Sequence, residues 1–186
     1  NGRVIAASSV TAENGVLTAT VQLLRIDEDT IQGQMALPND VVAHLSFLDN
    51  NSLHAVTATQ VVALDNTANQ LGVYSYGGRT LMYFCDIPEY GTALALAGDY
   101  QGHTTRLVTH NETAASQGEV DIADTLTDLT SSSNRVLALH GSQVESYPLN
   151  LTQGTTLTVE DGMMIQVAGR YLYALSGSEI QRLKAR

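Results

Sequence analysis

The chain has 186 residues, which is long enough for one domain with a substantial core. Hydrophobic residues make up 44% of the chain and charged residues only 15%, which excludes a disordered protein. Nineteen acidic residues against nine basic ones give a formal net charge of -10, so nucleic acid and anionic membrane surfaces are excluded as partners.

No run of eighteen apolar residues occurs, so this segment is not expected to insert directly into a membrane. The chain begins with Asn rather than Met, and it is rich in Ser, Thr and Gly without any Trp, as exported β-proteins often are. We therefore expect an extracellular or cell-surface location, in a bacterium, with an anchoring N-terminal segment that is missing from this sequence.

The first predicted elements are three strands, and no stretch of the chain shows a convincing helical period. These strands cover Arg3–Val10, Val16–Asp27 and Ile31–Leu37. Another strand begins each later unit, at Val42–Leu48, Leu81–Cys85, Thr125–Thr130 and Met163–Val167. Clusters of Asn, Asp, Ser and Gly between the strands favour tight turns. The pattern predicts an all-β protein.

A hairpin recurs along the chain. Ala174–Ile180 nearly repeats Ala138–Val144, 36 residues earlier, and Ala55–Val61 is a third copy. Each copy is typical of one strand ending, a turn of small residues and a second strand beginning. The second strands begin at Gln22, Gln60, Thr105, Gln143 and Glu179, so their spacings are 38, 45, 38 and 36 residues. A period near forty with short strands is typical of β-propeller blades.

A second repeated column supports the same period. A Gln-Gly pair or a near equivalent follows each hairpin, at Gln32-Gly33, Gln70-Leu71-Gly72, Gln117-Gly118 and Gln153-Gly154. The segments that follow alternate apolar and polar residues, as half-buried outer strands do. A complete unit is therefore predicted to have four antiparallel strands.

We predict a single propeller-like domain over residues 1–186, with complete blades at 40–78, 79–123 and 124–160 and partial blades at 1–39 and 161–186. The first unit lacks an inner strand and the last lacks an outer one, and proteins generally cover such open edges. Our hypothesis is that the chain is the C-terminal part of a larger propeller of about seven or eight blades. The remaining blades or a second chain would then cover the edges. A β-sandwich is the alternative, and the near-equal spacing argues against it.

Two segments carry a family resemblance. Val61–Thr67 and Leu172–Gly177 resemble the repeats of quinoprotein-like (PQQ-type) and YVTN-type bacterial propellers, in which a Val-x-Ala-Leu-Asp strand leads into a turn. The resemblance covers nearly the whole chain as a pattern and implies the propeller architecture. Quinoprotein repeats usually carry a Thr-Gly turn and a Trp after this strand, whereas this chain has Asn66–Asn69 and no Trp, so we expect no cofactor. The chain also resembles uncharacterised bacterial propeller-like proteins that follow an N-terminal membrane anchor.

Four acids lie just before or after the first strand of a unit: Asp40, Asp86, Asp124 and Asp161. Carboxylates at one mouth of a propeller favour a divalent cation, which supports an alternative function as a metal-dependent hydrolase or lactonase. The competing interpretation is that they are turn residues that end strands. No catalytic residue is predicted, because the chain has no Gly-x-Ser-x-Gly motif. Three histidines, His44, His54 and His140, fall in strands of different units, where packed or half-exposed side chains are expected.

Five tyrosines gather in the middle third of the chain: Tyr74, Tyr76, Tyr83, Tyr90 and Tyr100. Tyrosine is favoured at interfaces, so these residues are candidates for a binding face, with packing between blades as the alternative. We predict a non-catalytic binding or scaffold module of an exported or cell-surface protein, with a protein or a small polar ligand as its partner.

Overall fold

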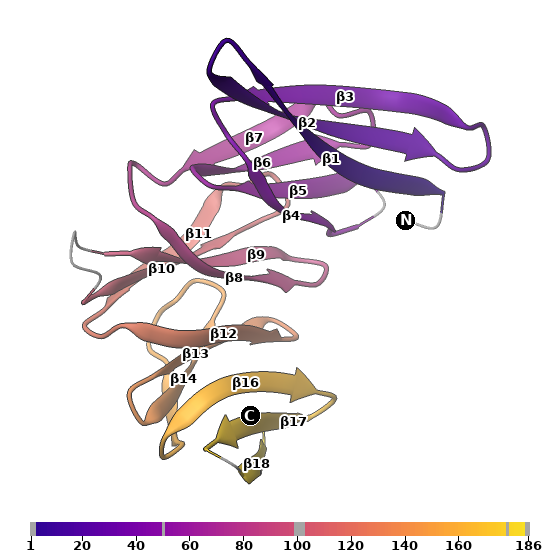
Figure 1. The fold of residues 1–186 in the computed structure, drawn as a ribbon. Coiled ribbons are helices and arrows are strands. Elements are labelled where there is room, and N and C mark those ends of the chain that lie inside the picture. The colour runs from indigo at the N-terminus through magenta and orange to yellow at the C-terminus, as the bar shows by residue number, and fades with distance from the viewer. Residues whose placement is uncertain (1–2, 50, 99–102, 178, 185–186) are drawn as a thin grey trace. The chain divides into compact units, whose positions relative to one another are not determined.

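The structure is a computed structural model that describes residues 3–49, 51–98, 103–177 and 179–184. Within these ranges every regular element is a β-strand (Figure 1). The strands form three four-stranded and two three-stranded antiparallel sheets. The all-β prediction and the expected number of complete and partial units are therefore confirmed. None of the described residues belongs to a helix that is long and apolar enough to cross a membrane.

The chain divides into two compact units, the first formed by Asn1–Gly78 with Asn111–Ala115 and the second by Arg79–His110 with Ser116–Arg186. The first unit contains two sheets. One holds β1 (Val4–Glu13), β2 (Val16–Arg25) and β3 (Thr30–Pro38), and the other holds β4 (Val42–Phe47), β5 (Ser52–Thr57), β6 (Gln60–Asp65) and β7 (Gln70–Ser75). In both sheets the spatial order of the strands equals their order in the chain, as consecutive hairpins produce.

The second unit contains three sheets with the same simple connectivity. The first of them holds β8 (Leu81–Ile87), β9 (Gly91–Ala97), β10 (Thr105–His110) and β11 (Ser116–Ile122). The second holds β12 (Leu126–Ser132), β13 (Arg135–His140), β14 (Gln143–Pro148) and β15 (Thr155–Thr158). The third holds β16 (Gly162–Ala168), β17 (Tyr171–Ser176) and β18 (Glu179–Lys184), and it ends without a fourth strand in the described part of the chain.

Among the described residues, three hydrophobic cores hold neighbouring sheets together in one recurring way. We call the face of a sheet that packs on the sheet following it in sequence its forward face, and the opposite face its rear face. The first core joins β1–β3 to β4–β7 through Val21, Leu23, Leu53 and Leu64. The second joins β8–β11 to β12–β15 through Ala95, Leu107, Val136 and Ala138. The third joins β12–β15 to β16–β18 through Leu139, Val144, Leu172 and Ala174. Because successive residues of a strand point to opposite faces, a sheet uses one set of apolar residues on its forward face and another on its rear face.

Close contacts between backbones explain the repeated glycine column. A Cβ atom on Gly33 would lie 1.9 Å from the carbonyl oxygen of Thr67, and one on Gly72 would lie 2.1 Å from that of Thr113. A Cβ atom on Gly118 would likewise lie 2.5 Å from the carbonyl oxygen of Asn150. In each case the turn before an outer strand packs on the outer strand of the preceding sheet, and only glycine leaves room for it.

The fourth predicted member of this column is different. In the strand pairing, Thr155 stands opposite Ser146, as Gly118 stands opposite Thr109 and Gly72 opposite Ala63. The position that corresponds to the docking glycines is therefore Thr155, which is exposed, and not the neighbouring Gly154. The sequence pattern was displaced here by one residue, a shift that moves a side chain to the other face of a strand.

The docking turns share a side-chain motif that the sequence analysis did not detect. Oδ1 of Asp65 accepts hydrogen bonds from the backbone amides of Thr67 and Asn69 at 2.8 Å each, and Oδ1 of Asn111 accepts the same bonds from Thr113 and Ala115 at 3.0 and 2.9 Å. The repeated unit is an Asx turn, in which Asp and Asn are interchangeable acceptors.

This turn makes folding stability depend on pH. Partial burial opposes the ionisation of Asp65, but hydrogen bonds from Asn69 and Thr67 outweigh it and lower the pKa to about 2. The contribution of Asp65 is therefore complete above its unfolded pKa of about 4 and is lost as the pH falls towards 2. We expect Asp65→Asn, which copies Asn111, to lose less thermal stability than the wild type over this range. Melting curves from pH 7 to pH 2 measure the difference, and parallel curves would contradict the assignment.

Candidate functional site

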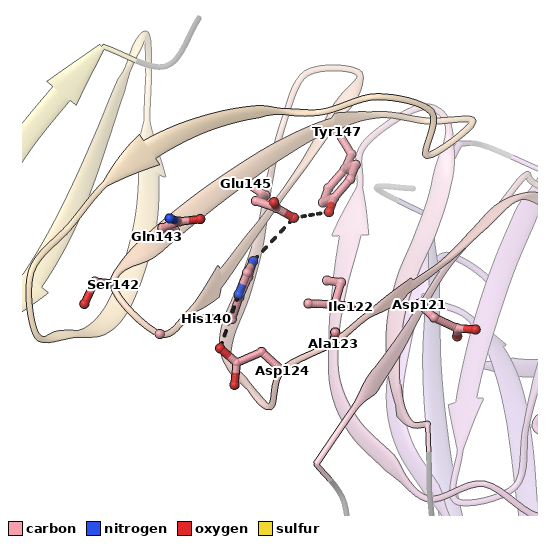
Figure 2. Close-up of a pocket in the computed structure, with 10 residues that line it drawn as sticks. Asp121, Ile122, Ala123, Asp124, His140, Ser142, Gln143, Glu145 and Tyr147 are labelled. Carbon is pink, nitrogen blue, oxygen red and sulfur yellow. Dashed lines mark hydrogen bonds and ion pairs between the residues drawn. The ribbon is translucent and has the colours of Figure 1, made fainter.

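A polar cavity of about 450 Å³ opens in the second unit (Figure 2). Its walls come from the end of β11 with the segment leading to β12, from the tight hairpin between β13 and β14, and from β14 itself. The side chains that dominate it are Asp124, His140, Glu145 and Tyr147. The hairpin fixes the backbone on both sides of His140, so the repeat places these groups at one rim of the sheet.

The four side chains form a continuous polar chain. The hydroxyl of the buried Tyr147 donates a hydrogen bond to Oε2 of Glu145. The same carboxylate oxygen lies 3.3 Å from Nε2 of His140, and Nδ1 of the ring lies 3.6 Å from Oδ2 of Asp124. Burial raises the pKa of Tyr147, and the hydrogen bond to Glu145 and the charge of that carboxylate raise it further, so the phenol stays a proton donor.

The cavity carries uncompensated negative charge. Asp121 at its edge is neutralised by Arg106, whose Nε lies 2.8 Å from Oδ1 of Asp121. No Lys or Arg is among the ten residues that line the cavity. Among these ten lining residues, only His140 could carry a positive charge beside the carboxylates of Asp124 and Glu145, and two carboxylates exceed the single charge that a histidine can carry.

The equivalent position in the first unit shows what this place in the repeat does elsewhere. Asp40 precedes β4 as Asp124 precedes β12. The carboxylate of Asp40, however, is surrounded by hydrogen-bond donors, and the residue is only 4% exposed. Its carboxylate accepts hydrogen bonds from the hydroxyls of Thr57 at 2.6 Å and Thr59 at 2.7 Å, and from the amide of Gln60 at 3.3 Å. Burial opposes the ionisation of Asp40, but these bonds together outweigh it and lower its pKa.

A tyrosine closes the site around Asp40. The hydroxyl of Tyr76 donates to the carbonyl oxygens of Thr57 at 3.1 Å and Gln60 at 2.9 Å, so the ring covers the hairpin. Burial raises the pKa of Tyr76, and the charge of Asp40 adds to the effect. Asp40 and Tyr76 are therefore structural groups that clamp the hairpin between β5 and β6.

In the sheet β12–β15, different residues stand at the positions that form this clamp in the first unit. Val42, the first residue of β4, pairs with Thr57, and Leu126, the first residue of β12, pairs with His140. His140 therefore stands where the other sheet has Thr57. Val159 stands in the place of Tyr76, because the backbone N–H of each donates a hydrogen bond of 3.0 Å to the carbonyl oxygen of the second turn residue, Ser142 or Thr59. The side chain of Asp124 is 52% exposed as a result, whereas that of Asp40 is closed in. The position that is closed around Asp40 is therefore part of an open cavity at Asp124.

The four predicted metal ligands are divided between the two units. Asp40 lies in the first unit and the other three lie in the second. Within the second unit, Asp124 and Asp161 precede β12 and β16, whereas Asp86 lies near the far end of β8, where its carbonyl accepts a hydrogen bond from Ser131. No cluster of three or more His, Cys, Asp or Glu suited to a metal ion occurs among the described residues. The metal-dependent alternative stays a prediction.

The predicted tyrosines lie in different surroundings. Tyr76 is buried in the clamp, and Tyr83 packs against the core that joins β8–β11 to β12–β15. Tyr74 is half-buried in β7, and Tyr90 is exposed in the turn before β9. Tyr100 lies outside the described residues. These positions assign Tyr76 and Tyr83 to packing and leave the predicted binding face untested.

Sequence reasoning missed the two residues that define the cavity. His140 was expected to be packed or half-exposed in a strand, and Glu145 was not considered as a site residue. A usable signal exists, because Glu145 stands two residues after the start of β14, where β6 has the buried Val62. An acid at the position where β6 has a buried aliphatic residue marks a departure from packing.

The geometry suits binding better than nucleophilic catalysis. Both ring nitrogens of His140 face carboxylates, so neither is directed at a hydroxyl that it could activate. Figure 2 shows the side chain of Ser142 directed away from the ring. The arrangement instead presents fixed carboxylates and a buried phenol at an open cavity, which is a pattern that recognises a cationic hydrogen-bond donor.

These sheets, with their successive hairpins and face-to-face cores, define a propeller-like fold. No protein-family model and no curated protein matches the sequence. Among solved structures, the chain is similar to KlHsv2 with loop 6CD replaced by a Gly-Ser linker, with 7% identity and a TM-score of 0.62 over 96% of this chain and 64% of that one. It is also similar to Sqt1 from Saccharomyces cerevisiae, with 14% identity and a TM-score of 0.61 over 92% of this chain and 55% of that one.

A third similar structure is a protein of unknown function from Bacteroides caccae, with 9% identity and a TM-score of 0.53 over 98% of this chain and 73% of that one. The chain thus spans less than two thirds of the first two proteins. At these identities the likeness shows the fold alone. The finer resemblance to quinoprotein-like repeats stays a prediction.

Proposed function

We propose that this protein is a non-catalytic, propeller-like binding module, and that the cavity around His140 receives a cationic side chain of a partner protein. One observation carries the proposal: Asp40 is closed in by hydrogen-bond donors, whereas Asp124, at the same position of the repeat, is half exposed in a cavity that it shares with Glu145. A lysine or arginine side chain would supply the missing donors and the missing positive charge.

Two further features support this proposal. The net charge of -10 favours encounter with basic partners, because long-range attraction raises the rate of association. The fold places the cavity at a rim where hairpin turns meet, and loops carried by a rigid scaffold are the usual place for binding residues. The tyrosine-rich segments have no part in this site.

The test is a titration of the labelled protein with Nα-acetyl-lysine N-methylamide, followed by NMR. We expect the backbone amides around the β13–β14 hairpin to shift, because the ammonium group would sit between the two carboxylates. Glu145→Gln keeps an acceptor for Tyr147 but removes one charge, so binding should weaken about ten-fold, or ~1.4 kcal/mol. Added salt should weaken the binding of the wild type in the same direction.

Two controls separate a specific site from general charge attraction. Glu13→Gln removes the same charge from an exposed residue of the first unit and should leave the titration unchanged. The uncharged norleucine analogue has nearly the same length and should produce no shifts at the hairpin. Equal binding by Glu145→Gln, or equal loss in Glu13→Gln, would contradict the proposal.

We further propose that the module acts outside the cytoplasm, anchored through a preceding segment, as its Ser- and Thr-rich composition without Trp favours. Fractionation of the source cells with an antibody against this chain tests the location. Recovery in the soluble cytoplasmic fraction would overturn it without affecting the binding proposal.

A further inference from the structure

The recurring cores set a rule for how these sheets associate. In all three described cores, the forward face of one sheet packs on the rear face of the next. The rear face of β1–β3 and the forward face of β16–β18 take part in none of these cores. Both of these faces carry exposed aliphatic side chains, such as Ile31 on the first and Ile180 on the second.

The forward face of β16–β18 is apolar and exposed. Met164, Leu175 and Ile180 form one row across the three strands, and Gln166, Tyr173 and Arg182 form the next. Ile180 is 72% exposed, although a large aliphatic residue gains from burial. All of these residues except Arg182 line a hollow of about 210 Å³. The residues on the opposite face of the sheet, such as Leu172 and Ala174, are buried in a core.

The rear face of β1–β3 offers a matching row. Ile5 pairs with Leu24 and Leu24 pairs with Ile31, so the three aliphatic side chains lie side by side across the sheet. Ile31 is 56% exposed and Ile5 is similarly open. In the next sheet the residues at the corresponding places are Leu53 and Leu64, which are completely buried against a forward face.

The charges around the two faces are complementary. Arg170 and Arg182 lie over the ring of Tyr171 at 5.3 and 4.8 Å from its centroid, and Lys184 ends β18. The turn between β2 and β3 carries three acids, Asp27, Glu28 and Asp29. Two basic residues lie near them: Arg25 pairs with the first two acids, and the charge of Arg3 acts on Asp27. In a chain with nine Lys and Arg residues, a basic cluster at one such face and an acidic cluster at the other are a notable match.

The repeat register brings these charges together. The turn after β6 reaches the preceding sheet at Gly33, which pairs with Leu23. Ala63, three residues after the start of β6, pairs with the docking glycine of its own sheet, Gly72. The residue at the same position of β18 is Arg182. If a β1–β3 sheet packed on β16–β18 by the same rule, the acidic turn would lie beside Arg182.

We propose that the forward face of β16–β18 binds the rear face of β1–β3 of a second copy of this chain, head to tail. Aliphatic rows would be buried at the centre, and the basic cluster of one copy would pair with the acidic turn of the other. Such a heterologous interface uses two different surfaces, so it forms closed dimers or longer assemblies. This proposal is independent of the cation-binding cavity.

Light scattering over a concentration series tests the proposal. We expect the wild type to reach twice the mass of one chain or more, and Ile180→Asp and Ile31→Asp each to remain monomeric. An equimolar mixture of these two variants should form a dimer again, because one keeps an intact rear face and the other an intact forward face. Unchanged melting temperatures of the two variants would show that both still fold.

Val73→Asp is the matched control, since Val73 is an exposed aliphatic residue of β7 on neither surface, and it should associate like the wild type. A monomeric wild type at all concentrations would overturn the proposal and assign the two faces to other partners. A mixture that stays monomeric, or one variant that dimerises alone, would overturn the head-to-tail arrangement.

Discussion

Gly33→Ala is expected to destabilise the protein by about 3 kcal/mol or more. The added Cβ would lie 1.9 Å from the carbonyl oxygen and 2.4 Å from the carbonyl carbon of Thr67, which is far inside contact distance. Both partners are backbone, so no side-chain rotation relieves the overlap, and the turn must leave the strand. Gly72→Ala and Gly118→Ala should behave alike, because each faces an equivalent carbonyl group. Chemical denaturation followed by circular dichroism measures the loss.

The matched control is Thr155→Ala, at the corresponding position of the sheet β12–β15, on which none of the described residues forms a docked turn. Thr155 is exposed, so its truncation should change stability by less than about 0.5 kcal/mol. Gly15→Ala is a second control, because Gly15 has a φ of 81° with open space around its Cβ position. It should cost about 1 to 2 kcal/mol through backbone strain alone. Equal losses in Gly33→Ala and Gly15→Ala would refute the steric explanation.

Asp40→Ala is expected to cost about 3 kcal/mol. The substitution removes an ionised acceptor from a closed site and leaves the hydroxyl of Thr59 and the amide of Gln60 without their carboxylate. Because the pKa of Asp40 is lowered, its contribution is present above the unfolded pKa of about 4 and fades as the pH falls below it. The deficit of Asp40→Ala relative to the wild type should therefore shrink in acid.

Asp124→Ala tests the same place in the repeat where the clamp is open. Its side chain is half exposed, so we expect a loss below about 1 kcal/mol in the free protein. A loss as large as that of Asp40→Ala would mean that Asp124 is a structural residue, and the cavity would then have no claim to a binding role. Asp40→Asn, which keeps one carbonyl acceptor, should lie between the two.

The strand pattern was predictable because it depends on local chemistry. Turn residues and alternating apolar residues recur about every forty positions, and this alone predicts four strands per unit. The inner strand expected at Val42–Leu48, for example, is β4 at Val42–Phe47. Even the glycine column was visible, although its purpose was not, since the partner carbonyl comes from a turn more than thirty residues away.

The candidate site was beyond the sequence for a related reason. Asp40 and Asp124 look alike in the chain, each just before an inner strand, and both were grouped as possible metal ligands. The two aspartates differ in the residues that the fold places around them. Thr57 and Tyr76 lie around Asp40, whereas His140 and Val159 stand at the same positions near Asp124. No local pattern contains that information.

The sequence by itself determined the secondary structure, the repeat and the strand count of each unit, because alternation and turn chemistry act between residues that are near neighbours in the chain. Only the tertiary structure decided which glycines must stay glycine and which acid is clamped or open. Those properties depend on contacts across hairpins and between sheets, where a carbonyl or hydroxyl from a distant segment either fills a site or leaves it to a partner.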